Sequence, residues 1–110
     1  MIILDTNALI YSIKQKIDLK KFLDEEIAVP LSAIRELETL SEKDRNAKLA
    51  LQMSSRFRIL EVESRGDRGI IEAASRYGGT VMTNDRELGK SLKEMNVRVA
   101  TISERMVRKP

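Results

Sequence analysis

Met1-Ile-Ile-Leu-Asp5-Thr-Asn7 opens the chain with four apolar residues, followed at once by an acid and two polar residues. A run this short and this apolar is typical of a strand buried on both faces, and Asp5 is a favoured residue for starting a helix after it. The same order of residue types returns at Thr80-Val-Met-Thr83-Asn-Asp85. Buried strands that lead directly into helices predict a parallel sheet covered by helices on both faces.

The rest of the sequence continues this alternation of strands and helices. Apolar runs predict further strands, and apolar residues spaced three or four positions apart predict helices. We therefore predict an α/β fold of three layers (α/β/α), in which a doubly wound parallel five-stranded sheet has the order 3-2-1-4-5. Strands are expected at residues 1–4, 27–30, 58–62, 80–83 and 97–102, and helices at about 7–17, 18–25, 32–40, 44–57, 66–78 and 85–95.

The length of 110 residues favours one domain with one core. We assign residues 1–104 to this domain and residues 105–110 to a loose basic tail. No apolar run approaches the length of a membrane span, and no basic segment precedes the apolar start, so we expect a cytoplasmic protein. On the helix near 44–57, the residues expected to face inward are Ala47, Leu49, Ala50, Leu51 and Met53.

The amino-acid composition limits the chemistry that this chain can perform. It contains no Cys, which excludes disulfides, thiol nucleophiles and thiolate zinc sites. It also contains no His, and thus lacks the commonest general base and the commonest transition-metal ligand. Any metal must be held by oxygen atoms, which favours Mg²⁺ or Mn²⁺. The net charge of +3 is a mild basic bias that is compatible with a nucleic-acid partner.

Four acids lie near the carboxyl ends of the predicted strands, namely Asp5, Glu36, Asp67 and Asp85. The carboxyl ends of parallel strands share one edge of the sheet, and ligands bind at that edge. Four carboxylates brought together there would repel one another and hold their protons unless a divalent cation lay among them. The sequence therefore predicts a metal site. The alternative for the three Asp residues is a role as helix N-caps, and for Glu36 a solvated charge.

These segments resemble, in the right order, the four motifs of PIN domains, a family of nucleases named for their likeness to the N-terminus of PilT. Ile2-Ile-Leu-Asp5-Thr-Asn7 resembles the first motif, and Glu36-Leu37 the second. Asp67-Arg-Gly-Ile70 resembles the third, and Thr80-Val-Met-Thr83-Asn-Asp85 the fourth. The resemblance extends over nearly the whole chain.

The resemblance implies a metal-dependent endoribonuclease that hydrolyses phosphodiester bonds of single-stranded or structured RNA. The four acids would then bind Mg²⁺ or Mn²⁺ and carry catalysis, with Asp5 and Asp85 as the main ligands. The family also implies an antitoxin or an RNA-processing partner, because it contains both toxin ribonucleases and nucleases that process ribosomal RNA. A homodimer is a further expectation. The supporting polar residues would be Thr6, Asn7, Thr83 and Asn84.

Other interpretations of the same residues remain open. Some relatives carry an acidic pair at the third motif, but here Arg68 follows Asp67, so a second metal ion loses a ligand. A catalytically inactive PIN-like protein that binds RNA or acts as a scaffold would keep the same fold. A phosphoacceptor receiver also has five parallel strands, but it requires an acidic pair after the first strand, where this chain has only Asp5.

The basic residues gather in three groups along the chain. Arg86, Lys90 and Lys93 share one helix face, and such residues near an acidic site can hold a phosphate backbone. The alternative is an ordinary solvated helix face. Aromatic residues make up only 4% of the chain, which leaves little scope for base stacking and predicts weak sequence specificity. The other two groups are Lys14, Lys16, Lys20 and Lys21, and Arg56, Arg58, Arg65 and Arg68.

Overall fold

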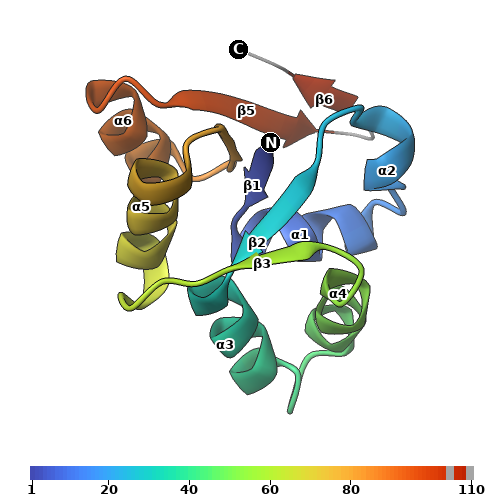
Figure 1. The fold of residues 1–110 in the computed structure, drawn as a ribbon. Coiled ribbons are helices and arrows are strands. Elements are labelled where there is room, and N and C mark those ends of the chain that lie inside the picture. Colours follow the sequence, from blue (N-terminus) through green and yellow to red (C-terminus); the bar gives the residue numbers. More distant parts are fainter. Residues whose placement is uncertain (104–105, 109–110) are drawn as a thin grey trace.

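A computed structural model describes residues 1–103 and 106–108 (Figure 1). Its sheet has the order β3-β2-β1-β4-β5-β6, and the first five strands are parallel in the predicted order 3-2-1-4-5. The strands are β1 (Ile2–Leu4), β2 (Ile27–Pro30), β3 (Arg58–Leu60), β4 (Thr80–Met82), β5 (Arg98–Ser103) and β6 (Met106–Arg108). The helices are α1 (Thr6–Lys14), α2 (Leu19–Phe22), α3 (Leu31–Leu40), α4 (Arg45–Ser54), α5 (Gly66–Tyr77) and α6 (Arg86–Glu94).

Strand β1 lies at the centre of the sheet, which explains why its short sequence is apolar throughout. All three of its residues are buried, and it pairs with β2 on one side and β4 on the other. Its odd and even side chains enter different cores: Ile2 and Leu4 pack with residues of α1, α3 and α4, whereas Ile3 packs with residues of α5 and α6. Two apolar cores on opposite faces of one sheet give the three layers that the sequence predicted.

The chain order reverses at β1, because β2 and β3 follow on one side and β4 and β5 on the other. Right-handed crossovers place the connections to the two halves on opposite faces, which leaves a crevice at the carboxyl ends of β1 and β4. The register pairs Leu4 with Met82, so that the residues just after these two strands, Asp5 and Thr83, become neighbours. The fold thus brings the first and fourth motifs together.

Two expectations from the sequence differ from the structure. The sequence predicts a loose tail at residues 105–110, but Met106–Arg108 form β6, which pairs antiparallel with β5. This pairing uses backbone groups on the outer edge of β5, which would otherwise lack partners. Residues 104–105 and 109–110 lie outside the described residues. The sequence also predicts that Leu49 faces inward, but it is 39% exposed, because it lies about 200° around α4 from the buried Ala47.

Helices α3 and α5 approach each other closely where Ser32 meets Gly69. A Cβ atom added at Gly69 would lie only 2.8 Å from the Ser64 carbonyl oxygen, and nearer still to the Ser32 side chain. Gly69 is therefore required for this contact, in contrast to Gly89 on α6, where an added Cβ would be 3.8 Å from Val99 Cγ1. The contact fixes α3 against α5, and these are the helices that carry Glu36 and Asp67.

We predict that Gly69→Ala destabilises the protein by about 1–3 kcal/mol, the usual cost of forcing an extra methyl group into a packed contact. Gly89→Ala serves as the matched control, because it meets only an ordinary van der Waals contact. It should stabilise the protein by up to about 1 kcal/mol, since Ala is the better helix former. Denaturant unfolding of both variants measures these changes, and equal effects at the two positions would contradict the proposed crowding at Gly69.

Candidate active site

Asp5 is a buried carboxylate at the end of β1, with a side chain that is held from two directions. Its Oδ1 accepts a hydrogen bond from the Ala8 backbone N–H at 2.7 Å, so it caps α1. Its Oδ2 accepts a hydrogen bond from the Thr83 hydroxyl, which comes from the loop after β4. Because two donors fix it in place, Asp5 presents its remaining lone pairs in a defined direction.

Thr83 connects the two acids that follow β1 and β4. It is 1% exposed, and while its hydroxyl donates to Asp5, its Oγ1 accepts the backbone N–H of Asp85 at 3.1 Å. Asp85 in turn caps α6, because its Oδ1 accepts the N–H groups of Glu87 at 2.9 Å and Leu88 at 3.1 Å. The capping interpretation thus holds for both Asp5 and Asp85, and it leaves oxygen lone pairs available on each carboxylate.

Asp67 and Glu36 come from helices rather than from strand ends. Asp67 lies in the first turn of α5, after the cap residue Arg65, so the N-cap role considered for it does not occur. Gly66 precedes it with a φ of +56°, a conformation that glycine adopts readily. Glu36 is exposed in the middle of α3. The contact between α3 and α5 at Ser32 and Gly69 sets the distance between these two acids.

A small hollow at the carboxyl edge of the sheet brings the four acids together. Its volume is about 30 Å³, enough for one water-sized occupant. The residues that line it include all four acids predicted from the sequence and two of the four predicted supporting residues. They are Asp5, Thr6, Asn7, Glu36, Asp67 and Asp85 with the neighbouring Ala33, Gly66 and Ile70. Thr83 adjoins the hollow through its hydrogen bond to Asp5.

Asn84 takes part in the site differently from the expected supporting role. Its side-chain amide donates to the Ile102 carbonyl at 2.6 Å, and its Oδ1 accepts the Ile102 N–H at 3.0 Å. With these two hydrogen bonds, the Asn84 side chain pairs with the backbone of Ile102 as a neighbouring strand would. They attach the loop between Thr83 and Asp85 to β5. Asn84 therefore stabilises the loop that carries Asp85, while its own polar groups are used by the backbone.

The electrostatics show that the acids act on one another. Burial raises the pKa of Asp5, the Thr83 and Ala8 hydrogen bonds oppose this, and the charges of Asp67 and Asp85 raise it further. The pKa of Asp67 is raised by partial burial and then by the charges of Asp85 and Glu87. Glu87 was not singled out from the sequence, although its place two residues after Asp85 puts it in the same helix turn.

The donor set matches a hard divalent cation in chemistry, because it consists of oxygen ligands only. The described side chains in their present rotamers nevertheless form no group of three or more acids that could hold a metal ion. Asp5 is held by its two donors and Asp85 by its capping bonds, whereas Glu36 and Asp67 are exposed and can change rotamer. Mutual repulsion favours separated carboxylates, so coordination would require these exposed acids to turn toward Asp5.

Comparison with known proteins identifies the family. The family model described as "PIN like domain" matches residues 2–105. The chain therefore belongs to the PIN-domain family, as its four sequence motifs predicted. In the part of the chain that the structure describes, no helix has the length and apolar character needed to cross a membrane.

Among characterised proteins, the chain is similar to Ribonuclease VapC9 from Archaeoglobus fulgidus. The two are 35% identical over 111 residues, which cover 93% of this chain and 82% of the relative. Among solved structures, it resembles a domain of a functionally unknown protein from Methanocaldococcus jannaschii, with a TM-score of 0.72 and 17% identity over 93% of this chain and 90% of that one. This second likeness supports the fold alone.

We predict that Asp67→Asn and Asp85→Asn each lower the pKa of Asp5, because each removes a negative charge that raises it. The pKa of Asp5 should stay above the ordinary value of 3.8 in both variants, since burial is the larger cause. Carbon-detected NMR titration of the Asp5 carboxyl measures this. Asp24→Asn is the control, because Asp24 precedes β2 at the opposite end of the sheet. An unchanged Asp5 pKa in both test variants would contradict a shared site.

The raised pKa of Asp5 makes the folding stability of the protein depend on pH. Folded protein holds the Asp5 proton more tightly than the unfolded chain does, because its pKa is raised above 3.8. The stability contributed by Asp5 is therefore fully present below that ordinary value and is lost as the pH rises through the raised pKa. Chemical denaturation across this range should show the decline, and the decline should be smaller in Asp5→Asn.

Proposed function

We propose that this protein is a divalent-metal-dependent endoribonuclease that hydrolyses phosphodiester bonds of single-stranded or structured RNA. The observation that supports this most strongly is the convergence of Asp5, Glu36, Asp67 and Asp85 on one small hollow. Membership of the PIN-domain family and similarity to a protein named as a ribonuclease support the same proposal. The absence of His and Cys from the chain directs the chemistry toward carboxylates and a hard cation.

In this proposal, Asp5 and Asp85 are the main ligands of Mg²⁺ or Mn²⁺, and Asp67 completes the site directly or through a water molecule. Asp5 is suited to this role because its two hydrogen bonds hold it at the inner wall of the hollow. A bound cation would lower the pKa of a water molecule and stabilise negative charge on the phosphate. One cation fits the hollow of about 30 Å³ better than two.

The protein's own groups then orient the reactants. Glu36 extends from α3 at the rim of the hollow, where its carboxylate can orient the attacking water and accept a proton on Oε1 or Oε2. Thr83 keeps Asp5 in one rotamer, and Thr6 and Asn7 supply polar atoms beside the acids. Burial is the first cause of the raised pKa values of Asp5 and Asp67, and the charges of neighbouring acids raise them further. A cation beside these carboxylates would favour their charged forms.

The cellular setting of this activity is also a proposal. Similarity to a protein named Ribonuclease VapC9 supports RNA as the substrate. An antitoxin or an RNA-processing protein would then be its partner, and a homodimer its assembly. A cytoplasmic location is part of the same proposal.

We predict that Asp5→Asn or Asp85→Asn lowers the rate of RNA cleavage by about 10²-fold or more, the usual cost of removing one preorganised electrostatic group. Glu36→Gln should lower kcat in the same assay, whereas Glu38→Gln, an exposed acid on the same helix, should leave cleavage unchanged. Cleavage of a labelled single-stranded RNA with Mg²⁺, with Mn²⁺ and with EDTA measures these effects.

Thermal unfolding with and without Mn²⁺ provides the control that the variants stay folded. Saturating Mn²⁺ should stabilise the wild type by about 2.7 kcal/mol at a hundredfold excess over Kd, and it should stabilise Asp5→Asn much less. Retention of RNA with no divalent-dependent cleavage in the wild type would support the inactive RNA-binding alternative. Cleavage by Asp5→Asn at the wild-type rate would refute the proposed ligand.

A further inference from the structure

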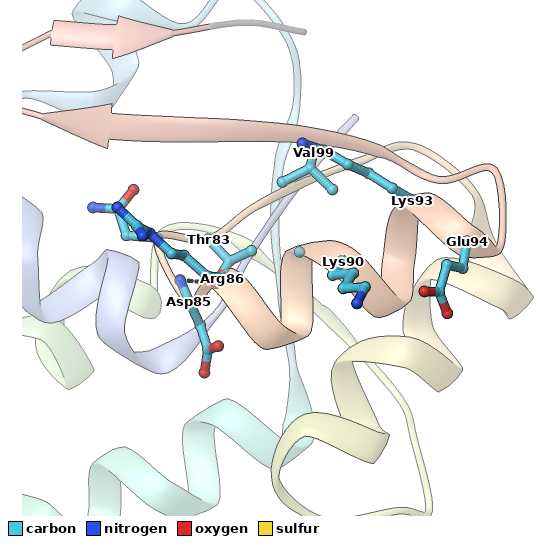
Figure 2. Close-up of a pocket in the computed structure, with 9 residues that line it drawn as sticks. Thr83, Asp85, Arg86, Lys90, Lys93, Glu94 and Val99 are labelled. Atoms are coloured by element: carbon cyan, nitrogen blue, oxygen red, sulfur yellow. Dashed lines mark hydrogen bonds between the residues drawn. The ribbon is translucent and has the colours of Figure 1, made fainter.

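A second cavity, which we call the cleft, lies beside the acidic hollow, between helix α6 and strand β5 (Figure 2). Its volume is about 610 Å³, within the usual range for sites that bind small organic ligands. Asp85 lines both the cleft and the acidic hollow, so the two adjoin at the start of α6. In Figure 2 the Asp85 carboxylate points away from β5, while Val99 on β5 faces the helix.

Three cations line this cleft, namely Arg86, Lys90 and Lys93. Their spacing of four and three residues places them on one face of α6, and all three are exposed. The ion pairs among the described residues use other groups, so none of these three cations is neutralised by a partner there. Glu94 lines the cleft as well, at the end of α6.

The floor of the cleft is apolar and open. Gly89 lies between Arg86 and Lys90 in the sequence and has no side chain, and a Cβ atom added there would come within 3.8 Å of Val99 Cγ1. This is an ordinary van der Waals distance, so the absence of a side chain at position 89 leaves open space between α6 and β5. Val99 is half-buried and presents an aliphatic surface to this space. The cleft thus combines an apolar floor with a cationic rim.

We propose that this cleft binds one nucleotide of the RNA strand next to the phosphate that the acidic hollow cleaves, an inference that rests on the proposed function. Arg86, Lys90 and Lys93 hold the phosphate of that nucleotide, and its sugar and base lie against Gly89 and Val99. The carboxylates of the adjoining acidic hollow would by themselves repel a polyanion, and the positive charges of the cleft offset this repulsion. Asp85 marks the boundary between the two sites, because it lines both of them.

The cleft should accept a single strand with little preference for the base. Val99 offers an aliphatic surface rather than a hydrogen bond to a base edge, and the Asn84 amide is already used by Ile102. No Trp, Tyr or Phe lines the cleft among the described residues, so base stacking on an aromatic ring does not contribute. The carboxylates of an acidic peptide would match the cations but would leave the apolar surface of Gly89 and Val99 uncovered, so we favour RNA.

The test compares Lys90→Gln/Lys93→Gln with Lys43→Gln/Lys48→Gln, which makes the same change in charge at exposed lysines near α4, away from the cleft. Anisotropy of a labelled RNA decamer in EDTA gives Kd as a function of salt. The cleft variant should bind about tenfold more weakly, as expected when a charge-assisted hydrogen bond is removed. Its log Kd should also depend less steeply on log salt, by about 0.7 for each phosphate that the protein no longer neutralises.

Cleavage kinetics give an independent readout. The cleft variant should raise KM with kcat unchanged within about twofold, because the two lysines hold substrate and transition state alike. The lysine pair near α4 should behave as wild type in both assays. Equal Kd, salt slope and KM in the two double variants would overturn the nucleotide site. Displacement of the decamer by polyglutamate as effectively as by unlabelled RNA, at equal charge concentration, would overturn RNA as its ligand.

These results separate the cleft from the proposed nuclease. If the wild type cleaves RNA and the cleft variant equals it in binding and in KM, the cleft proposal fails and the nuclease proposal stands. If the wild type binds RNA through Lys90 and Lys93 but cleaves nothing with Mg²⁺ or Mn²⁺, the nuclease proposal fails and the binding site stands. A wild type that neither binds nor cleaves RNA would overturn both.

Discussion

The hydrogen bond from Thr83 to the buried carboxylate of Asp5 is the interaction on which the site depends. Asp5 is 5% exposed, and a buried carboxylate is costly unless its oxygens find donors, which Thr83 and Ala8 supply. Those donors come from the loop after β4 and from α1, so satisfying Asp5 requires that β1 and β4 pair in one register. The same hydroxyl also receives the N–H of Asp85, which positions the second acid relative to the first.

The sequence was sufficient to predict the strand order and the acids that lie at the carboxyl edge of the sheet. Both follow from the way in which parallel strands pair and end at one edge. Residues directly after β1 and β4 must be neighbours once those strands pair at the point where the order reverses, and Asp5, Thr83 and Asp85 occupy these positions. Glu36 and Asp67 were located less directly, from motif resemblance and from their position several residues after a predicted strand. Their distance from Asp5 depends on helix packing, which periodicity does not determine.

The features that could not be predicted are those set by tertiary contacts between small or polar groups. Asn84 could equally have faced the site, and only the position of β5 shows that Ile102 takes both of its amide groups. Strand β6 was missed because it has only three residues, Met106–Arg108, which pair with β5 by backbone atoms at the edge of the sheet. The charge of Glu87 on α6 raises the pKa of Asp67 on α5. Because the two acids come from different helices, residue spacing within one segment could not predict this interaction.

The contact between Ser32 and Gly69 has a consequence for how relatives of this protein can diverge. Ser32 is buried, and its hydroxyl has no hydrogen-bond partner in the described structure, so its size matters more here than its polarity. A larger residue at either position would separate α3 from α5 and widen the gap between the acids they carry. Homologues with a side chain at the position of Gly69 should therefore carry a residue smaller than Ser at the position of Ser32.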